Sequence, residues 1–133
     1  MILIKRAFLN QIFTHLQMCY PEEGCGLVAG SELGRVTAVY PIENHLHSPT
    51  TFLMNPQQQI QAMLDLEASG WQLLAIYHSH PHGPETPSPT DIQQATYPEA
   101  FSIIVSLADL TKPTVRIFQI TGPKVTEKKM QVV

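Results

Sequence analysis

A short apolar segment in the middle of the chain, residues 73–77, runs directly into the sequence His78-Ser79-His80. Its side chains are apolar at both alternating positions, which is typical of a central strand that is covered on both faces. Side chains two apart on a strand point to the same face, so the imidazoles of His78 and His80 can converge on one point. We therefore expect a fold built around a buried strand that carries two metal-ligating groups at its end.

The rest of the chain predicts helices and further strands around this central strand. Helices are expected over residues 6–18, 56–70 and about 89–96, the second with Ile60, Met63 and Leu64 on one side. Strands are expected at 26–30 and 35–40, which form a hairpin, and at 50–54, 101–107 and 114–120. The expected fold class is α/β with α+β character, a mixed sheet flanked by helices. Residues 1–123 are expected to form one domain and 124–133 a short, weakly held tail.

The composition is consistent with one globular domain and excludes several functions. With 133 residues, 44% of them hydrophobic, the chain can bury a core, and a second domain is not expected. The net charge of −3 argues against nucleic-acid or membrane-surface binding. The longest apolar run is too short to span a bilayer, and the first residues lack the pattern of a secretory signal. Two cysteines cannot form a disulfide scaffold, so a cytoplasmic protein is expected.

A carboxylate follows the two histidines at a distance that could complete a metal site. Asp91 lies in the string Ser88-Pro89-Thr90-Asp91, at the start of a predicted helix, and the proline-rich residues 81–89 exclude regular structure before it. Two imidazoles and one carboxylate would give a three-ligand zinc site with a free fourth position, as in catalytic zinc. Zinc there would acidify a bound water and polarise a carbonyl. Glu22 and Glu23, just before the first strand of the hairpin, are the best candidates for a general base.

Each of these features also has a simpler interpretation. An isolated His-x-His pair is more often structural or solvated than a metal site. Ser88 and Asp91 also fit a capping box, with serine at the N-cap, proline at the first helical position and an acidic residue at the third. Glu22 and Glu23 could be ordinary loop residues. Their joint occurrence at the end of a buried strand favours the metal site.

The same residues resemble the JAMM, or MPN+, family of metallopeptidases. The spacing from His78 and His80 through Ser88 to Asp91 matches the family signature His-x-His-x(7)-Ser-x(2)-Asp without a substitution. Upstream, the segment Pro21-Glu22-Glu23-Gly24-Cys25-Gly26 resembles the family's Pro-x-Glu-x-x-Gly, in which the glutamate is the catalytic base. This match selects Glu23 over Glu22. Residues 52–56 and 77–81 are similar to those of short bacterial and archaeal members.

The resemblance implies a fold, a metal and a role for each residue. The implied architecture is a curved mixed sheet with flanking helices, of the JAMM and cytidine-deaminase type. By the resemblance, His78, His80 and Asp91 bind Zn²⁺. Glu23 takes a proton from the bound water and passes it to the leaving amine. Ser88 donates a hydrogen bond to the developing oxyanion.

The resemblance also implies a class of substrate. Family members cleave the amide bond after the Gly-Gly tail of ubiquitin or a ubiquitin-like protein. The chain has no room for the ubiquitin-gripping insertions of eukaryotic members, so it is similar to bacterial members that process small sulfur-carrier proteins. The tail is expected to add as a strand beside residues 50–54.

Other functions stay open beside this interpretation. One is a peptidase with a different substrate, including a deubiquitinase-like isopeptidase that acts on protein conjugates. Another is a non-catalytic MPN scaffold that binds partner proteins, which would require missing ligands, whereas every motif position here is filled. A zinc nucleoside deaminase is excluded because its cysteine ligands are absent. The carrier, the released residue and the oligomeric state do not follow from the sequence.

The remaining histidines, cysteines and methionines are expected to lie outside the site. His15 is expected on the surface of the first helix, and His45, His47 and His82 in loops. Cys25 is expected to be a small buried residue. The methionines Met18, Met54 and Met63 are expected in the core.

Overall fold

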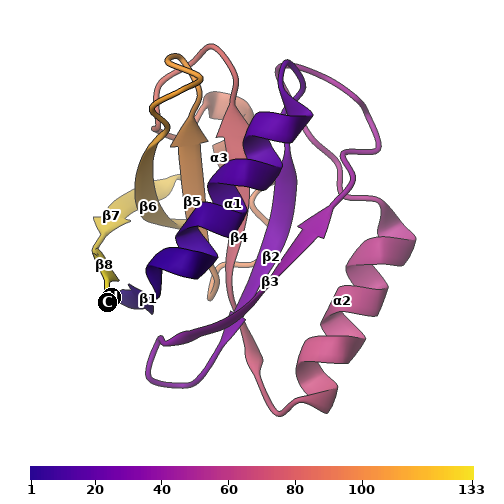
Figure 1. The fold of residues 1–133 in the computed structure, drawn as a ribbon, viewed down its shortest axis with the longest axis vertical. Helices are drawn as coiled ribbons and strands as arrows, with labels where there is room; N and C mark the ends of the chain where they lie inside the picture. The colour runs from indigo at the N-terminus through magenta and orange to yellow at the C-terminus, as the bar shows by residue number, and fades with distance from the viewer.

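A computed structural model describes residues 1–133 as a mixed β-sheet with helices packed against it (Figure 1). The elements follow in the order β1 (Ile2–Ile4), α1 (Arg6–Cys19), β2 (Cys25–Gly30), β3 (Val36–Ile42), α2 (Pro56–Ala68), β4 (Gln72–His80), α3 (Pro89–Gln94), β5 (Phe101–Ser106), β6 (Thr114–Thr121), β7 (Lys124–Lys128) and β8 (Met130–Val132). The expected fold class, a mixed sheet flanked by helices, is confirmed. No helix is long and apolar enough to cross a membrane.

The predicted central strand is β4. The main sheet has the strand order β3-β2-β4-β5-β6-β7, in which β4 pairs antiparallel with β2 and parallel with β5. The side chains of β4 are buried from Leu74 onward except at Ile76, which is half-buried. Because β2 runs antiparallel to β4, the beginning of β2 lies beside the histidines at the end of β4, with Cys25 opposite His78. The sheet therefore brings the segment containing Glu23 to the histidine end.

Helix α1 covers one face of the sheet. Its buried residues Leu9, Ile12 and Leu16 follow helical spacing and belong to the larger core cluster, together with Tyr77. Gly26 is required at this contact, because a Cβ there would collide with the Tyr77 ring. Burial of each large apolar side chain stabilises the fold by roughly 1.5–3 kcal/mol, so α1 and the sheet face it covers form one rigid unit.

Helix α2 lies beside β3 in Figure 1. It covers the opposite face of the sheet, because its Ala62 packs with Cys25 and Leu27, whereas Val28 of the same strand packs on the side of α1. It begins at Pro56 and its N-cap is Asn55, whose side chain accepts hydrogen bonds from two backbone N–H groups. The residues that α2 buries are Ala62 and Leu66, in a smaller core near Cys25 and Met54. Of the side expected to be apolar, Met63 is half-buried against this core, whereas Ile60 and Leu64 face outward and are 61% and 55% exposed.

Two segments differ from the prediction. Residues 50–54 form no strand. Only Met54 makes an isolated bridge, to Asn44, because neighbouring backbone groups bond to the Asn44 side chain. Residues 124–133, expected to be a weakly held tail, form β7 and β8. Gly122, at φ +60°, makes the turn into β7 possible, and β8 pairs in parallel with β1, a strand that the sequence did not predict.

Two residues of α1 were placed wrongly. Met18, expected in the core, is 79% exposed because its position falls on the outer side of the helix. His15, expected on the surface, is half-buried, and its Nδ1 lies 2.7 Å from the Tyr77 hydroxyl. A buried phenol needs a polar partner, and His15 supplies it. Cys25 is buried, as expected, and burial raises the pKa of its thiol to about 12, which keeps the thiol uncharged and unreactive at neutral pH.

Candidate metal centre

Three predicted donor atoms meet at the end of β4. The Nε2 atoms of His78 and His80 lie 3.2 Å apart, and Asp91 Oδ2 lies 3.2 Å from the first and 2.9 Å from the second. Two nitrogen or oxygen donors on a tetrahedral zinc ion, each ~2.0–2.1 Å from it, are about 3.3 Å apart. The three atoms therefore form a set of the kind and size that could hold a metal ion.

Neighbouring groups fix the orientation of both imidazoles. The Nδ1–H of His80 donates to the carbonyl of Pro84 at 2.7 Å, which leaves Nε2 free to act as a ligand. The ring of Phe52 packs against the His78 ring, with 4.8 Å between the centroids. The residues between the ligands are also held to the sheet, because Ser106 Oγ donates to the carbonyl of Gly83.

The capping box at the start of α3 orients the carboxylate of Asp91. Ser88 N–H donates to Asp91 Oδ2 at 2.9 Å, and Asp91 N–H donates to Ser88 Oγ at 3.1 Å. Burial favours the neutral form of Asp91, but without a metal the Nε2 atoms of His78 and His80 can carry protons, and their hydrogen bonds outweigh burial and hold the pKa of Asp91 well below the usual range. The oxygen that faces both histidines is thus a carboxylate oxygen. The capping and metal interpretations of this segment are compatible.

Glu23 is buried next to the donor set and is not neutralised by a partner. Its side chain is 3% exposed, and its Oε1 makes no hydrogen bond. Burial, opposed in part by His80, raises the pKa of the carboxyl to about 7. Glu22 points elsewhere, since its carboxylate contacts His47 at 3.0 Å near the surface. Of the two candidate bases, only Glu23 therefore has a buried carboxylate beside the ligands.

Two hydrogen bonds join the strand that follows Glu23 to the strand that carries the histidines. Ser79 N–H donates to the carbonyl of Gly24 at 3.1 Å, and Gly24 N–H donates to Ser79 Oγ at 2.9 Å. Ser79 is the residue between the two histidine ligands, and Gly24 directly follows Glu23. These bonds, one between backbone groups and one to the Ser79 side chain, hold the backbone next to Glu23 against the strand of the two histidines.

Sequence reasoning missed Asn44, which organises the loop over the site. Its buried amide donates to the carbonyls of Glu23 and Thr51 at 3.0 and 3.1 Å, and its Oδ1 accepts from the N–H groups of Leu46 and Leu53. A buried amide with these partners ties the backbone of Glu23 to the loop. An asparagine followed by a proline-containing loop is the only sequence signal, and it is a weak one.

An apolar cavity of about 480 Å³ opens beside the donor set. His78 and Asp91 form part of its wall. The remaining wall is mostly apolar and includes Phe52, Met54, Ile76, Phe101 and Ile120. Such a cavity next to convergent polar groups is the usual form of a ligand site. The remaining loop histidines, His45, His47 and His82, are exposed and do not join the donor set.

The fold and this donor set define a JAB-type domain, and comparison with known proteins gives the same result. Residues 5–121 match the family model described as prokaryotic homologs of the JAB domain. The chain therefore belongs to this family, and the resemblance to JAMM proteins is confirmed.

Relatives in the family include proteins with named activities. The CysO-cysteine peptidase of Mycobacterium tuberculosis is 31% identical over 133 residues, which cover 99% of this chain and 91% of that protein. The probable TtuB-protein conjugate cleaving protease of Thermus thermophilus is 43% identical over 95 residues, which cover 71% of this chain and 63% of that protein. Among solved structures, protein DSY2949 of Desulfitobacterium hafniense superposes with a TM-score of 0.91 at 34% identity, over 100% of this chain and 93% of that one.

Proposed function

We propose that this chain is a zinc-dependent peptidase that hydrolyses the amide bond after the Gly-Gly tail of a ubiquitin-like sulfur-carrier protein. The observation that carries the proposal is the buried, unpartnered carboxylate of Glu23 beside the converging atoms of His78, His80 and Asp91. Burying a carboxylate without a hydrogen-bond partner costs folding free energy. A role as a general base, which needs a pKa near neutrality, explains why a glutamate stands at this position.

The donor set fits zinc in chemistry and in spacing, and His78, His80 and Asp91 would hold it. Bound there, zinc supplies an acidified water and polarises the carbonyl of the scissile amide. Glu23 accepts a proton from the attacking water and delivers it to the nitrogen of the leaving amine as the C–N bond breaks. The Ser88 hydroxyl accepts only from Asp91 N–H, so its hydrogen is free to donate to the carbonyl oxygen as negative charge develops there.

The substrate class comes from the relatives and is consistent with the cavity. The relative from Mycobacterium tuberculosis, which is similar along almost the whole chain, is named CysO-cysteine peptidase. We infer from this name that a cysteine is released from a carrier protein. The wall of the cavity carries no lysine or arginine, which suits an uncharged, flexible tail. Leu53 N–H and the carbonyls of Thr51 and Leu53 already bond to Asn44 and His45, so pairing of the tail with residues 50–54 is left to the opposite edge of this segment, where Phe52 lines the cavity. We place the tail in the cavity, where it can reach this edge.

Cleavage of a defined carrier tests the proposal. The purified, zinc-loaded protein would be incubated with a sulfur-carrier protein that carries one cysteine after its Gly-Gly end, and the products identified by mass spectrometry. We expect release of cysteine from the parent protein and from Glu22→Gln, and none from Glu23→Gln. If the parent protein holds zinc and cleaves no carrier, the non-catalytic scaffold becomes the better explanation.

A second candidate is cleavage of isopeptide bonds in protein conjugates. The relative from Thermus thermophilus is named for cleaving conjugates of TtuB, and two archaeal relatives are named desampylase. The same experiment with a carrier joined to a lysine side chain separates the two substrates by their relative kcat/KM. We place both reactions in the cytoplasm, because Cys19 and Cys25 are free thiols, as expected in a reducing compartment.

A further inference from the structure

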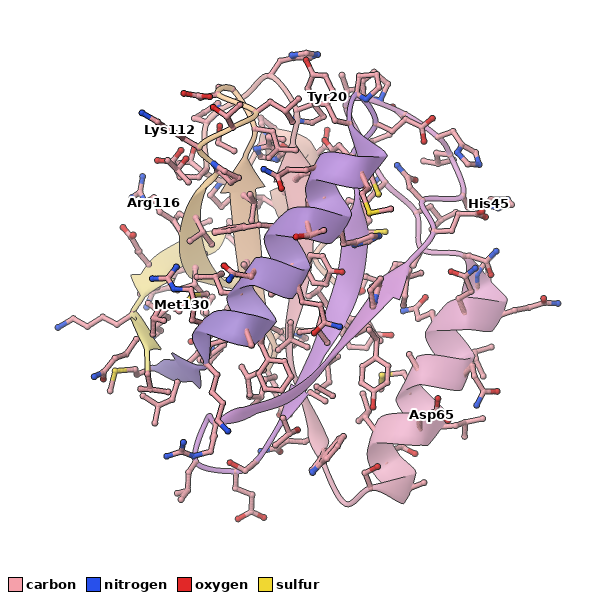
Figure 2. All side chains as sticks on the ribbon, viewed as in Figure 1. Tyr20, His45, Asp65, Lys112, Arg116 and Met130 are labelled. Atoms are coloured by element: carbon pink, nitrogen blue, oxygen red, sulfur yellow. The ribbon has the colours of Figure 1, made fainter.

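The positive charges of the chain are confined to one part of the molecule. All eight lysines and arginines lie outside residues 36–111. That stretch contains α2, the donor set and most of the cavity wall, and its acidic residues are Glu43, Asp65, Glu67, Glu85, Asp91, Glu99 and Asp109. In Figure 2, Lys112 and Arg116 lie on the side of β6, whereas Asp65 lies on the side of α2. Helix α2 and the wall of the cavity therefore carry acidic side chains and no lysine or arginine.

The same surface exposes large apolar side chains. Gln59 lines the cavity and donates to the Tyr97 hydroxyl across it at 3.2 Å, and Leu53 and Tyr97 are exposed cavity-lining residues. Ile60 and Leu64, both more than half exposed, lie four residues apart and therefore share one side of α2, next to the side that carries Gln59. These five residues, together with the exposed Glu67 of α2, are called the α2 face.

We propose that the α2 face binds the folded body of the carrier, and that the carrier presents an apolar patch flanked by lysines or arginines beside its tail. This inference rests on the proposed function. Clustered exposed apolar side chains rimmed by charge are typical of interaction surfaces. The carboxylate of Glu67 forms no ion pair within the chain, so it is available to cations of a partner. The face also adjoins the cavity, so a body bound there can place its tail at the donor set.

Kinetics with two matched substrates test this surface. One substrate is a sulfur-carrier protein with a cysteine after its Gly-Gly end, and the other is a short peptide with the same tail and scissile bond. For the double variant Ile60→Ser, Leu64→Ser, we expect KM for the carrier to rise by roughly 10-fold or more, because apolar anchors dominate interface affinity. We expect kcat/KM for the peptide to stay within about 2-fold, since the peptide has no body to dock.

The contribution of charge needs a control with the same change in net charge. Glu67→Lys is expected to raise KM for the carrier by about 3- to 10-fold at low salt, and less at high salt. Glu32→Lys is the control, since Glu32 is exposed on the β2–β3 turn, at the end of β2 remote from Glu23. It should leave KM for both substrates unchanged. Unchanged melting temperatures would show that the variants are folded.

The outcomes separate this inference from the proposed function. If the parent protein cleaves neither substrate, the proposed function fails. If it cleaves both, and the double variant alters carrier and peptide equally or neither, the docking surface is wrong. If the double variant leaves the KM values unchanged but converts an oligomer to a monomer in sedimentation analysis, the face is an interface between copies of this chain and the inference is overturned.

Discussion

The two irregular segments that border the metal centre are held in place by different physical means. Residues 81–88 contain several prolines, which restrict the backbone before the chain folds. Residues 44–54 depend on Asn44, whose amide bonds to backbone groups only once the loop has closed around it. The first segment joins His80 to Asp91, two of the three candidate metal ligands, and the second holds the backbone of Glu23 and one wall of the cavity. Damage to each segment should therefore have a different signature.

The largest effect is expected from loss of a ligand at the start of the proline-rich segment. His80→Ala removes one of three donor atoms, and we expect loss of bound zinc and of all measurable turnover. Metal content by mass spectrometry and carrier cleavage are the measurements. His82→Ala is the matched control, because His82 is exposed two residues further along and should retain both properties. Full metal content in His80→Ala would contradict the assignment of the site.

A smaller effect is expected from Ser88→Ala at the other end of the same segment. If Ser88 stabilises the oxyanion, kcat should fall by about 10²- to 10³-fold while zinc stays bound. Loss of its cap on α3 should also cost about 1 kcal/mol of stability. Steady-state kinetics and thermal unfolding of the same sample separate the two roles. Unchanged kcat with a lowered melting temperature would leave Ser88 only the capping role.

The loop that depends on Asn44 should fail in a different way. Asn44→Ala leaves two backbone carbonyls and two N–H groups without their partner, and we expect destabilisation of about 2–4 kcal/mol. Because Glu23 loses one of its backbone anchors, kcat should fall roughly 10-fold with the zinc content unchanged. The control is Asn55→Ala, which removes the cap of α2 from the same segment and should lower stability alone. Equal kcat values for the two variants would show that Asn44 does not position Glu23.

The smallest expected effect is a pH-dependent change in stability that arises from Glu23. In the metal-free protein, the folded-state pKa of about 7 exceeds the usual value of 4.5. The stabilising contribution is full below pH 4.5 and is lost as the pH rises through 7, because the unfolded state releases the proton first. At pH 8, metal-free Glu23→Gln should therefore be more stable than the parent by about 1–3 kcal/mol, and the difference should shrink toward pH 4.5. Urea unfolding across this pH range measures the difference in the free energy of unfolding between the two proteins. A difference that does not change with pH would contradict the buried-carboxylate interpretation.

The sequence predicted those parts of the site that local spacing determines. The apolar run before His78 identified the central strand, and the interval to Asp91 identified the third donor atom. The prolines excluded regular structure between them. Asn44 was missed because its role depends on partners brought together by the folded loop, and nothing in its neighbours specifies them.

The errors in the fold have a common origin in tertiary context. Residues 50–54 have a strand-like composition, but an asparagine side chain takes the place of a neighbouring strand. Residues 124–133 appear polar and poorly packed in isolation, yet β6 and β1 provide edges with which they pair. Ile60 and Leu64 follow helical spacing correctly, but α2 buries Ala62 and Leu66 and turns these two outward. Periodicity predicts a side of a helix and not what that side faces.

The paired hydrogen bonds between Gly24 and Ser79 also bear on how a domain of this kind can change its specificity. They tie the residue after Glu23 to the residue between the two histidines, and no atom of α2 takes part in them. Substitutions on the exposed side of α2 can therefore alter which partner is accepted without disturbing these two bonds. The scaffold is in this sense modular, and a designer could retarget it by redesigning the outer surface alone.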